Sequence, residues 1–203
     1  EGALPMLNGG LGLNVMTDKI AKNEFLGLNL SYAYRMDLAD GNLGIGVSVG
    51  MLQDGVSGEY VSEMPGDASI PSVGKGSGFD FGAGLYYTSE TIYVGVSSTH
   101  INEPLVVSSE DLLQVERHYY LTAGYSHELN PSLVLLPSVF VKSDGVSASL
   151  DASALLEYNN RFWGGVSVRS SESSVAVALL GMRLNENLKF GVAYDVPTSA
   201  VSG

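Results

Sequence analysis

Apolar and small residues alternate without interruption along Asn42–Leu52, which reads NLGIGVSVGML. A period of two predicts a β-strand, because successive side chains of a strand point to opposite faces. The small-residue side carries no charge, unlike the water-facing side of a soluble sandwich, so the pattern favours a transmembrane-barrel strand whose apolar side meets lipid. The apolar set is Leu43, Ile45, Val47, Val49 and Met51, and the small set is Gly44, Gly46, Ser48 and Gly50.

The same alternation recurs along the chain and predicts about eleven strands. Most have about nine to thirteen residues, which exceeds the ~5–6 usual in globular proteins and suits the ~9–11 that a tilted strand needs to cross a membrane. The predicted strands are Leu7–Met16, Glu24–Met36, Asn42–Leu52, Gly78–Thr88, Thr91–Ser98, Arg117–His127, Ser132–Lys142, Ser147–Leu156, Arg161–Arg169, Ser174–Arg183 and Leu188–Asp195.

Alternation also assigns the two faces of most strands. The strands Ser132–Lys142 and Ser174–Arg183 are apolar on both faces, so their phase stays open, and Pro137 predicts a bulge or kink because proline donates no ladder hydrogen bond. Residues expected to face outward include Leu11, Leu13, Val15, Leu26, Leu28, Leu30, Tyr32, Phe81, Ala83, Leu85, Ile92, Val94, Val96, Leu121, Ala123, Leu150, Ala152 and Ala154.

Short turns and longer connections alternate strictly, which places all short turns at the same end of an up-and-down barrel. Outer-membrane barrels have short periplasmic turns and longer extracellular loops, so Gln53–Ser77 and Ser98–Glu116 are expected outside the cell. Outward aromatics are expected at both ends, as in the aromatic girdles of membrane barrels: Tyr34, Tyr87, Tyr125, Phe162 and Phe190 at the periplasmic end, and Phe79, Tyr119 and Tyr194 at the other.

Composition fits this architecture. Charged residues are 16% of the chain, below the ~25% of soluble domains, and 25 of 203 residues are glycine. No apolar run approaches the ~18 residues of a transmembrane helix, and there is no cysteine to form a disulfide or thiolate site. The net charge of −12 argues against a nucleic-acid partner. The chain opens at Glu1 without a signal peptide, which is expected of a processed or truncated chain.

Charged residues in the barrel wall are expected to face the lumen, because charge is unfavourable against lipid. They form either a salt-bridge network that fills the barrel, the favoured interpretation, or an ion path or plug contact. The lumen-facing candidates are Arg35, Asp80, His118, Asp151, Arg169 and Asp195. Acidic residues in the two long loops are candidates for partner contact: Asp54, Glu59, Glu63, Asp67, Glu103, Glu110 and Asp111.

Other chemistry is weakly supported. His100, His118 and His127 are too far apart in sequence for a local metal motif. No serine has the His/Asp arrangement or the GxSxG elbow of a hydrolase. Gly74–Gly78 lacks the full phosphate-loop spacing, and the loop acids lack the spacing of a calcium loop. We therefore expect no catalytic residues, no metal and no cofactor.

Several stretches in the same order resemble the PorP/SprF family of outer-membrane proteins of the Bacteroidetes type IX secretion and gliding machinery. The resemblance covers nearly the whole chain, and the stretch Arg117–Tyr125, RHYYLTAGY, is its most specific part. The other stretches are Thr17–Ile20, Leu30–Arg35, Phe81–Tyr87, Tyr93–Ser97, Leu136–Val139, Phe162–Arg169 and Phe190–Asp195.

The resemblance implies an all-β, antiparallel, up-and-down transmembrane β-barrel of about fourteen strands, with about eleven represented in a single domain over residues 1–203. Two N-terminal strands and the last C-terminal strand are then expected to be missing. The resemblance also implies a bacterial outer-membrane protein, not an enzyme, that exports or anchors surface adhesins or other cargo with C-terminal sorting domains. Its implied partners are outer-membrane lipid, the secreted cargo, and periplasmic ring or lipoprotein components.

Two alternatives share this architecture. One is a passive pore or a transporter of hydrophobic substrates, which predicts an open polar lumen and solute flux. The other is a barrel enzyme acting on lipid, which predicts loss of activity on replacing one serine or histidine, although no candidate pair is visible.

Overall fold

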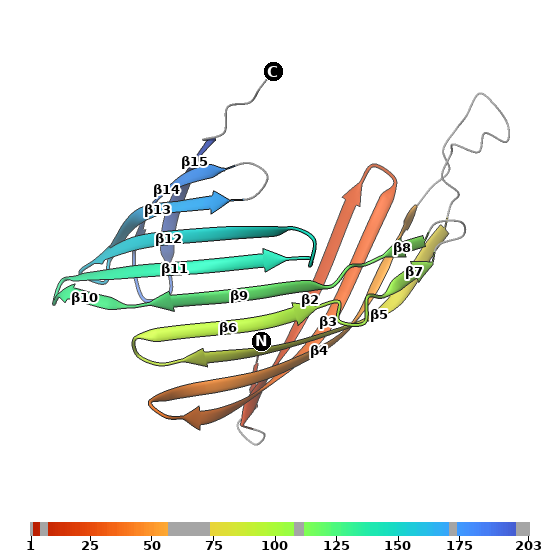
Figure 1. Cartoon of the computed structure of the whole chain (residues 1–203), viewed down its shortest axis with the longest axis horizontal. Helices are drawn as coiled ribbons and strands as arrows, with labels where there is room; N and C mark the ends of the chain where they lie inside the picture. The colour runs from red at the N-terminus through yellow and green to blue at the C-terminus, as the bar shows by residue number, and fades with distance from the viewer. Residues whose placement is uncertain (1, 5–7, 57–73, 108–111, 171–173, 198–203) are drawn as a thin grey trace. The chain divides into compact units, whose positions relative to one another are not determined.

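The computed structural model describes residues 2–4, 8–56, 74–107, 112–170 and 174–197, and their regular structure is entirely β-strand. Figure 1 traces the strands in chain order. They are β1 (Gly2–Leu4), β2 (Gly9–Ile20), β3 (Asn23–Leu38), β4 (Gly41–Val56), β5 (Gly74–Thr88), β6 (Ile92–Thr99), β7 (Leu105–Val107), β8 (Leu112–Gln114), β9 (His118–Tyr125), β10 (His127–Asn130), β11 (Leu133–Ser143), β12 (Ala148–Tyr158), β13 (Phe162–Ser170), β14 (Val175–Arg183) and β15 (Lys189–Pro197).

Within the described residues, thirteen strands form one antiparallel sheet whose order follows the chain: β1-β2-β3-β4-β5-β6-β9-β11-β12-β13-β14-β15, with β10 also paired to β11. The strands β7 and β8 pair separately as a small hairpin. The predicted all-β, antiparallel, up-and-down fold is confirmed, and all eleven predicted strands are present. Closure of the sheet into a barrel stays a prediction.

Residue contacts divide the chain into two units. The first comprises Glu1–Met36, Gly44–Gly84 and Ser98–His118, and the second comprises Asp37–Leu43, Leu85–Ser97 and Tyr119–Gly203.

The first unit has one exposed apolar face and one face of small or polar residues. The register of β2 and β3 places Leu13 opposite Leu30, and these side chains are 70% and 49% exposed. The alternate pair, Asn14 opposite Asn29, lies on the other face, as predicted. An extended exposed apolar face of this kind requires lipid or another apolar surface against it.

The second unit repeats this arrangement. In β12 and β13, Ala152 lies opposite Val168 on the apolar face, while Ser153 lies opposite Ser167 on the polar face. The two serine hydroxyl oxygens are 2.9 Å apart and hydrogen-bonded. The same registers settle the two open phases: Val139 joins Ala152 on the apolar face, and Val177 joins Ser167 on the polar face.

Pro137 does not bulge the sheet toward β12, so the prediction of a bulge is wrong on that side, and a local kink stays a prediction. The β11–β12 register runs without a shift, and Pro137 lies opposite Ala154. Pro137 has no backbone N–H to donate, and the ladder on the other side of β11 is interrupted next to it. There the partner strand changes from β9, which ends its pairing at Gly124, to β10, which begins its pairing at His127. Proline is thus accommodated by a gap in one ladder rather than by an extra residue.

Trp163 on the polar face of the second unit packs across two glycines of neighbouring strands. A Cβ added to Gly181 would lie 2.1 Å from the indole, and one added to Gly191 would lie 2.8 Å from it. Because both positions are glycine, the indole ring packs directly against the backbone of the sheet. A larger residue at either position would have to displace the indole ring.

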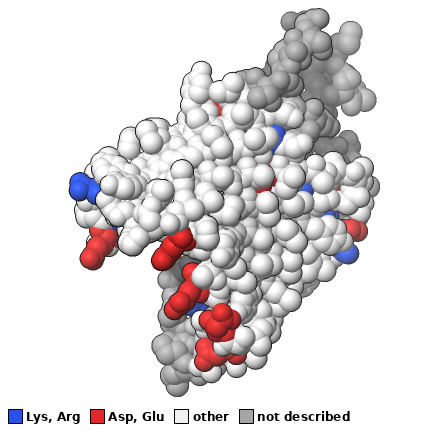
Figure 2. Space-filling view, turned by 60° about the vertical axis from the view of Figure 1, so that its left-hand side comes forward, with Lys and Arg blue, Asp and Glu red and all other residues white. Residues whose placement is uncertain are grey.

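Among the residues that the structure describes, no helix is long and apolar enough to cross a membrane. Uncharged residues cover most of the surface visible in Figure 2, and acidic side chains lie in small groups.

Candidate functional site

The chain reverses over the polar face of β5 in the first unit, where β6 ends. Val106 of the β7–β8 hairpin is 1% exposed and is the most deeply buried side chain among the described residues. Gly78 of β5 makes this packing possible, since a Cβ there would meet Pro104 at 3.3 Å and Val106 at 3.5 Å. Leu52 and Val56 of β4, which alternation places on the same face, are also buried. The region predicted as a free loop thus includes a packed hairpin.

A buried carboxylate connects β5 to the start of this reversal. Asp80 is 5% exposed, and its Oδ1 lies 2.9 Å from Nδ1 of His100. A carboxylate oxygen only accepts, so the imidazole nitrogen donates. Burying a carboxylate without a partner is strongly unfavourable, and the histidine supplies that partner. Strand alternation places Asp80 on the face opposite Phe81, and its predicted position toward a lumen stays a prediction.

Backbone geometry and the polar side chain of Asn102 hold the turn that follows. His100 and Glu103 have positive φ angles of 54° and 47°, and the Glu103 amide donates to the His100 carbonyl at 2.9 Å. Asn102 replaces ladder bonds by accepting from the Phe81 amide at 3.1 Å and donating to the Phe79 carbonyl at 2.8 Å. The turn is therefore fixed to β5 on both sides of Asp80.

Arg117 closes the far end of the reversal. Its guanidinium donates to the Ile101 carbonyl and lies 3.7 Å from the Glu103 carboxylate. The exposed Arg117–Glu103 pair adds little by itself. Its effect is to hold Arg117, at the end of the connection, against Ile101 and Glu103 at its beginning.

His118 is brought next to His100, although 18 positions separate them in the sequence. The ring centroids are 6.0 Å apart with an edge-on arrangement, and Nδ1 of His118 donates to the Glu116 carbonyl at 3.0 Å. Sequence spacing alone gave no sign of this proximity, because it results from the chain reversal. Within the described ranges, no group of three or more His, Asp or Glu side chains is placed to hold a metal ion.

The other predicted lumen-facing charges are distributed over both units. In the second unit, Asp151 and Arg169 are cross-strand neighbours, with Oδ1 and Nε 2.7 Å apart. Asp195 shares their face by register but lies opposite Val177 rather than beside Arg169. In the first unit, Arg35 is exposed in β3 at a position that alternates with the outward Tyr34. Of these charges, the structure thus pairs Asp151 with Arg169.

Only part of the predicted partner surface lies in the described residues. Asp54 is in β4 and half-buried, and Glu103 is exposed at the turn described above. The other candidates lie outside the described residues: Glu59, Glu63, Asp67, Glu110 and Asp111.

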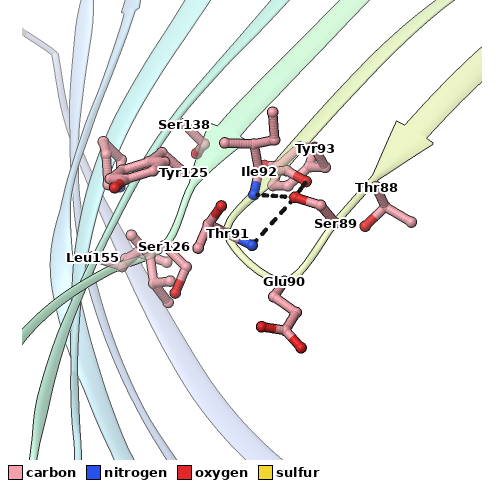
Figure 3. Close-up of a pocket in the computed structure, with 12 residues that line it drawn as sticks. Thr88, Ser89, Glu90, Thr91, Ile92, Tyr93, Tyr125, Ser126, Ser138 and Leu155 are labelled. Atoms are coloured by element: carbon pink, nitrogen blue, oxygen red, sulfur yellow. Dashed lines mark hydrogen bonds between the residues drawn. The ribbon is translucent and has the colours of Figure 1, made fainter. Parts of the chain in front are cut away.

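A pocket of about 270 Å³ occupies the gap beside Pro137 in the second unit. Figure 3 shows Thr88–Tyr93 on one side of it and Tyr125, Ser126 and Leu155 on the other. Ser89 Oγ accepts hydrogen bonds from the amides of Thr91 and Ile92 at 3.4 and 3.2 Å, which fixes the β5–β6 turn. No cluster of catalytic groups lines this pocket.

The turn between β11 and β12 is organised by Asp144. Its Oδ1 accepts from the amides of Val146 and Ser147 at 2.9 and 2.7 Å, and its Oδ2 accepts from the Ser147 hydroxyl at 2.9 Å. These bonds stabilise the ionised form and lower the pKa of Asp144 to about 2, with the Ser147 amide contributing most.

The amino-acid sequence that forms this sheet matches the model of a family of membrane proteins. The family described as type IX secretion system membrane protein PorP/SprF matches residues 3–203. The chain belongs to the PorP/SprF family. It is therefore a type IX secretion system membrane protein by family, and the predicted resemblance is confirmed. Neither the curated proteins nor the solved structures contain a match to this PorP/SprF chain.

Proposed function

We propose that this PorP/SprF protein is a non-enzymatic outer-membrane β-barrel component of type IX protein secretion. In this role it exports or anchors surface adhesins or other cargo with C-terminal sorting domains. The observation that carries the proposal is the family match over residues 3–203, on a chain whose strands alternate between an exposed apolar face and a polar face. That alternation is what a lipid-facing barrel wall requires.

The proposal assigns the two ends of the strands different partners. The segments around β4–β5 and β6–β9 face the outside and present their acidic residues to cargo. The short turns, such as Asp37–Gly41 and the one at Glu90, face periplasmic ring or lipoprotein components. The strands form a single barrel domain of about fourteen strands, as the family resemblance implies.

The packed hairpin favours a scaffold over a passive pore. A pore needs its polar face open to water, whereas in the first unit the β7–β8 hairpin packs on that face at Gly78, where Val106 and Asp80 are buried. Solute flux is therefore expected to be low. Among the residues that the structure describes, we find no nucleophile with an oriented base, and we propose no reaction.

The test is affinity purification of the tagged protein from outer membranes of its host, followed by mass spectrometry. We expect surface cargo and periplasmic components of the secretion machinery to be recovered. A variant with Glu103, Glu110 and Asp111 changed to Gln or Asn should lose cargo but keep periplasmic partners. The matched control changes Asp37, Asp40 and Glu90 at the opposite strand ends and should keep cargo.

Recovery of the barrel alone, in membranes where the machinery is present, would contradict the secretion role. Large solute flux through the purified protein in liposomes would favour the pore instead. Both measurements use the same preparation, so they separate the two candidate functions directly.

A further inference from the structure

Two lysines from different hairpins of the first unit meet at one carboxylate. Nζ of Lys19 lies 2.6 Å from Oε1 of Glu24, and Nζ of Lys75 lies 2.6 Å from Oε2 of the same residue. Each carboxylate oxygen thus takes one ammonium, and Glu24 fixes the two cations beside each other. The side chains of Lys19 and Lys75 remain 63% and 40% exposed.

This cluster lies on the apolar face of the sheet. Lys19 is the cross-strand partner of Glu24, and farther along the same register Val15 lies opposite Leu28. Because directly paired residues of neighbouring strands share a face, the cations border the exposed apolar surface. On β5, Lys75 is in phase with Phe79, which is 69% exposed.

Its local charge opposes that of the chain. The whole protein carries −12, yet the two lysines and Glu24 sum to +1. The nearby acids Asp18 and Asp54 fall on the other face by strand alternation. An ammonium has three donors, so a bond to Glu24 leaves others for a second acceptor.

We propose that Lys19 and Lys75 bind the phosphate of an anionic lipid headgroup, with Glu24 positioning the two ammonium groups. This inference rests on the proposed placement in a membrane, with the apolar face against lipid. There a long lysine side chain at the end of a strand extends to the headgroup region while its alkyl part stays on apolar surface. A phosphate has several oxygens and can accept from both ammonium groups at once.

The probe is phosphatidylglycerol added to the full purified chain in zwitterionic detergent, with bound lipids counted by native mass spectrometry. We expect phosphatidylglycerol to bind and phosphatidylcholine, whose headgroup is neutral overall, to bind much more weakly. A lysine near an anionic headgroup contributes about fivefold in affinity, so K19A/K75A should lose about 30-fold. K19R/K75R should keep the binding.

The matched control is K142A/K189A, which removes the same charge away from Glu24. An equal loss of phosphatidylglycerol affinity in K142A/K189A would show that net charge alone causes the effect, and it would overturn the proposal. Wild-type binding by K19A/K75A would also overturn it, as would displacement of the lipid by inorganic phosphate at equal concentration. If K19A/K75A does not fold, the folded single variants K19Q and K75Q give the same decision, each with about a fivefold loss expected.

The outcome is separable from that of the proposed function. If phosphatidylglycerol does not bind but cargo is recovered, only the lipid-binding inference is overturned. Intact lipid binding with no recovery of cargo or machinery overturns the secretion role alone.

Discussion

Truncating Val106 to alanine tests whether the hairpin is held on β5 by packing. Val106 is 1% exposed, so the change removes two buried carbon groups at about 0.8 kcal/mol each, or ~1.6 kcal/mol. The cavity left behind adds about 24 cal/mol per Å³. We therefore expect the docked hairpin to lose about 2 kcal/mol relative to its open state.

That loss converts into an opening equilibrium about 30-fold more favourable, because about 1.4 kcal/mol corresponds to a factor of ten. This change in the opening equilibrium is measured by hydrogen exchange of the β7 and β8 amides in the reconstituted protein. The measurement is made under conditions in which the exchange rate is proportional to the equilibrium constant for opening. The amides of β11 and β12 in the same sample serve as an internal reference and should not change.

Val107→Ala is the matched control, because the neighbouring side chain is 55% exposed and points to the opposite side of the same strand. It carries the same truncation and should alter exchange by less than about twofold, since exposed substitutions have small effects. Equal exchange in the Val106→Ala and Val107→Ala proteins would refute the packing argument. So would unchanged β7–β8 exchange in Val106→Ala.

Three further predictions concern the second unit. Because Arg169 is 53% exposed, a double-mutant cycle of Asp151→Asn and Arg169→Gln by urea unfolding should give a coupling of ~0.2–1 kcal/mol, and a value above ~2 kcal/mol would contradict the exposure argument. NMR titration should give a pKa of about 2 for Asp144. Because folding lowers this pKa, the turn's contribution to the free energy of unfolding is fully present above the ordinary value of 3.8 and is lost as the pH falls through about 2. A measured pKa near 3.8 would argue against the hydrogen-bonded turn. Gly181→Ala should displace Trp163, the only tryptophan, shifting its fluorescence and costing ~1–3 kcal/mol, whereas an unchanged spectrum would show that the ring does not lie on Gly181.

Alternation predicted the strands because each has two faces with different surroundings. Ile45, Val47 and Val49 are exposed on the apolar face, whereas Gly46 and Ser48 between them lie on the other face. Where both faces are apolar, as in β11 and β14, alternation carries no phase information. Only the register against Ser153 and Ser167 assigns those strands to their faces.

The candidate site was less predictable because it depends on contacts between distant segments. Asp80 was expected on the polar face, but its partner His100 is 20 residues away in a segment that reads as a loop. The strands of the hairpin, Leu105–Val107 and Leu112–Gln114, have three residues each, which is too short for a periodic signal. A signal was available in Leu105-Val106-Val107 followed by Leu112-Leu113, an apolar repeat inside an otherwise acidic connection.

The small residues of the polar face can leave space for solute or provide room for packing, and their surroundings differ along the sheet. At Gly78 an added Cβ would contact the hairpin, and at Gly82 it would lie 2.5 Å from the Ser48 hydroxyl oxygen. At Gly46 the nearest atoms are backbone oxygens at 3.8 Å or more. In the first unit the small residues of β5 thus serve close packing beneath the reversal, whereas Gly46 of β4 has room for a side chain. Close packing on this part of the polar face suits a protein that presents folded segments to a partner better than one that conducts solute.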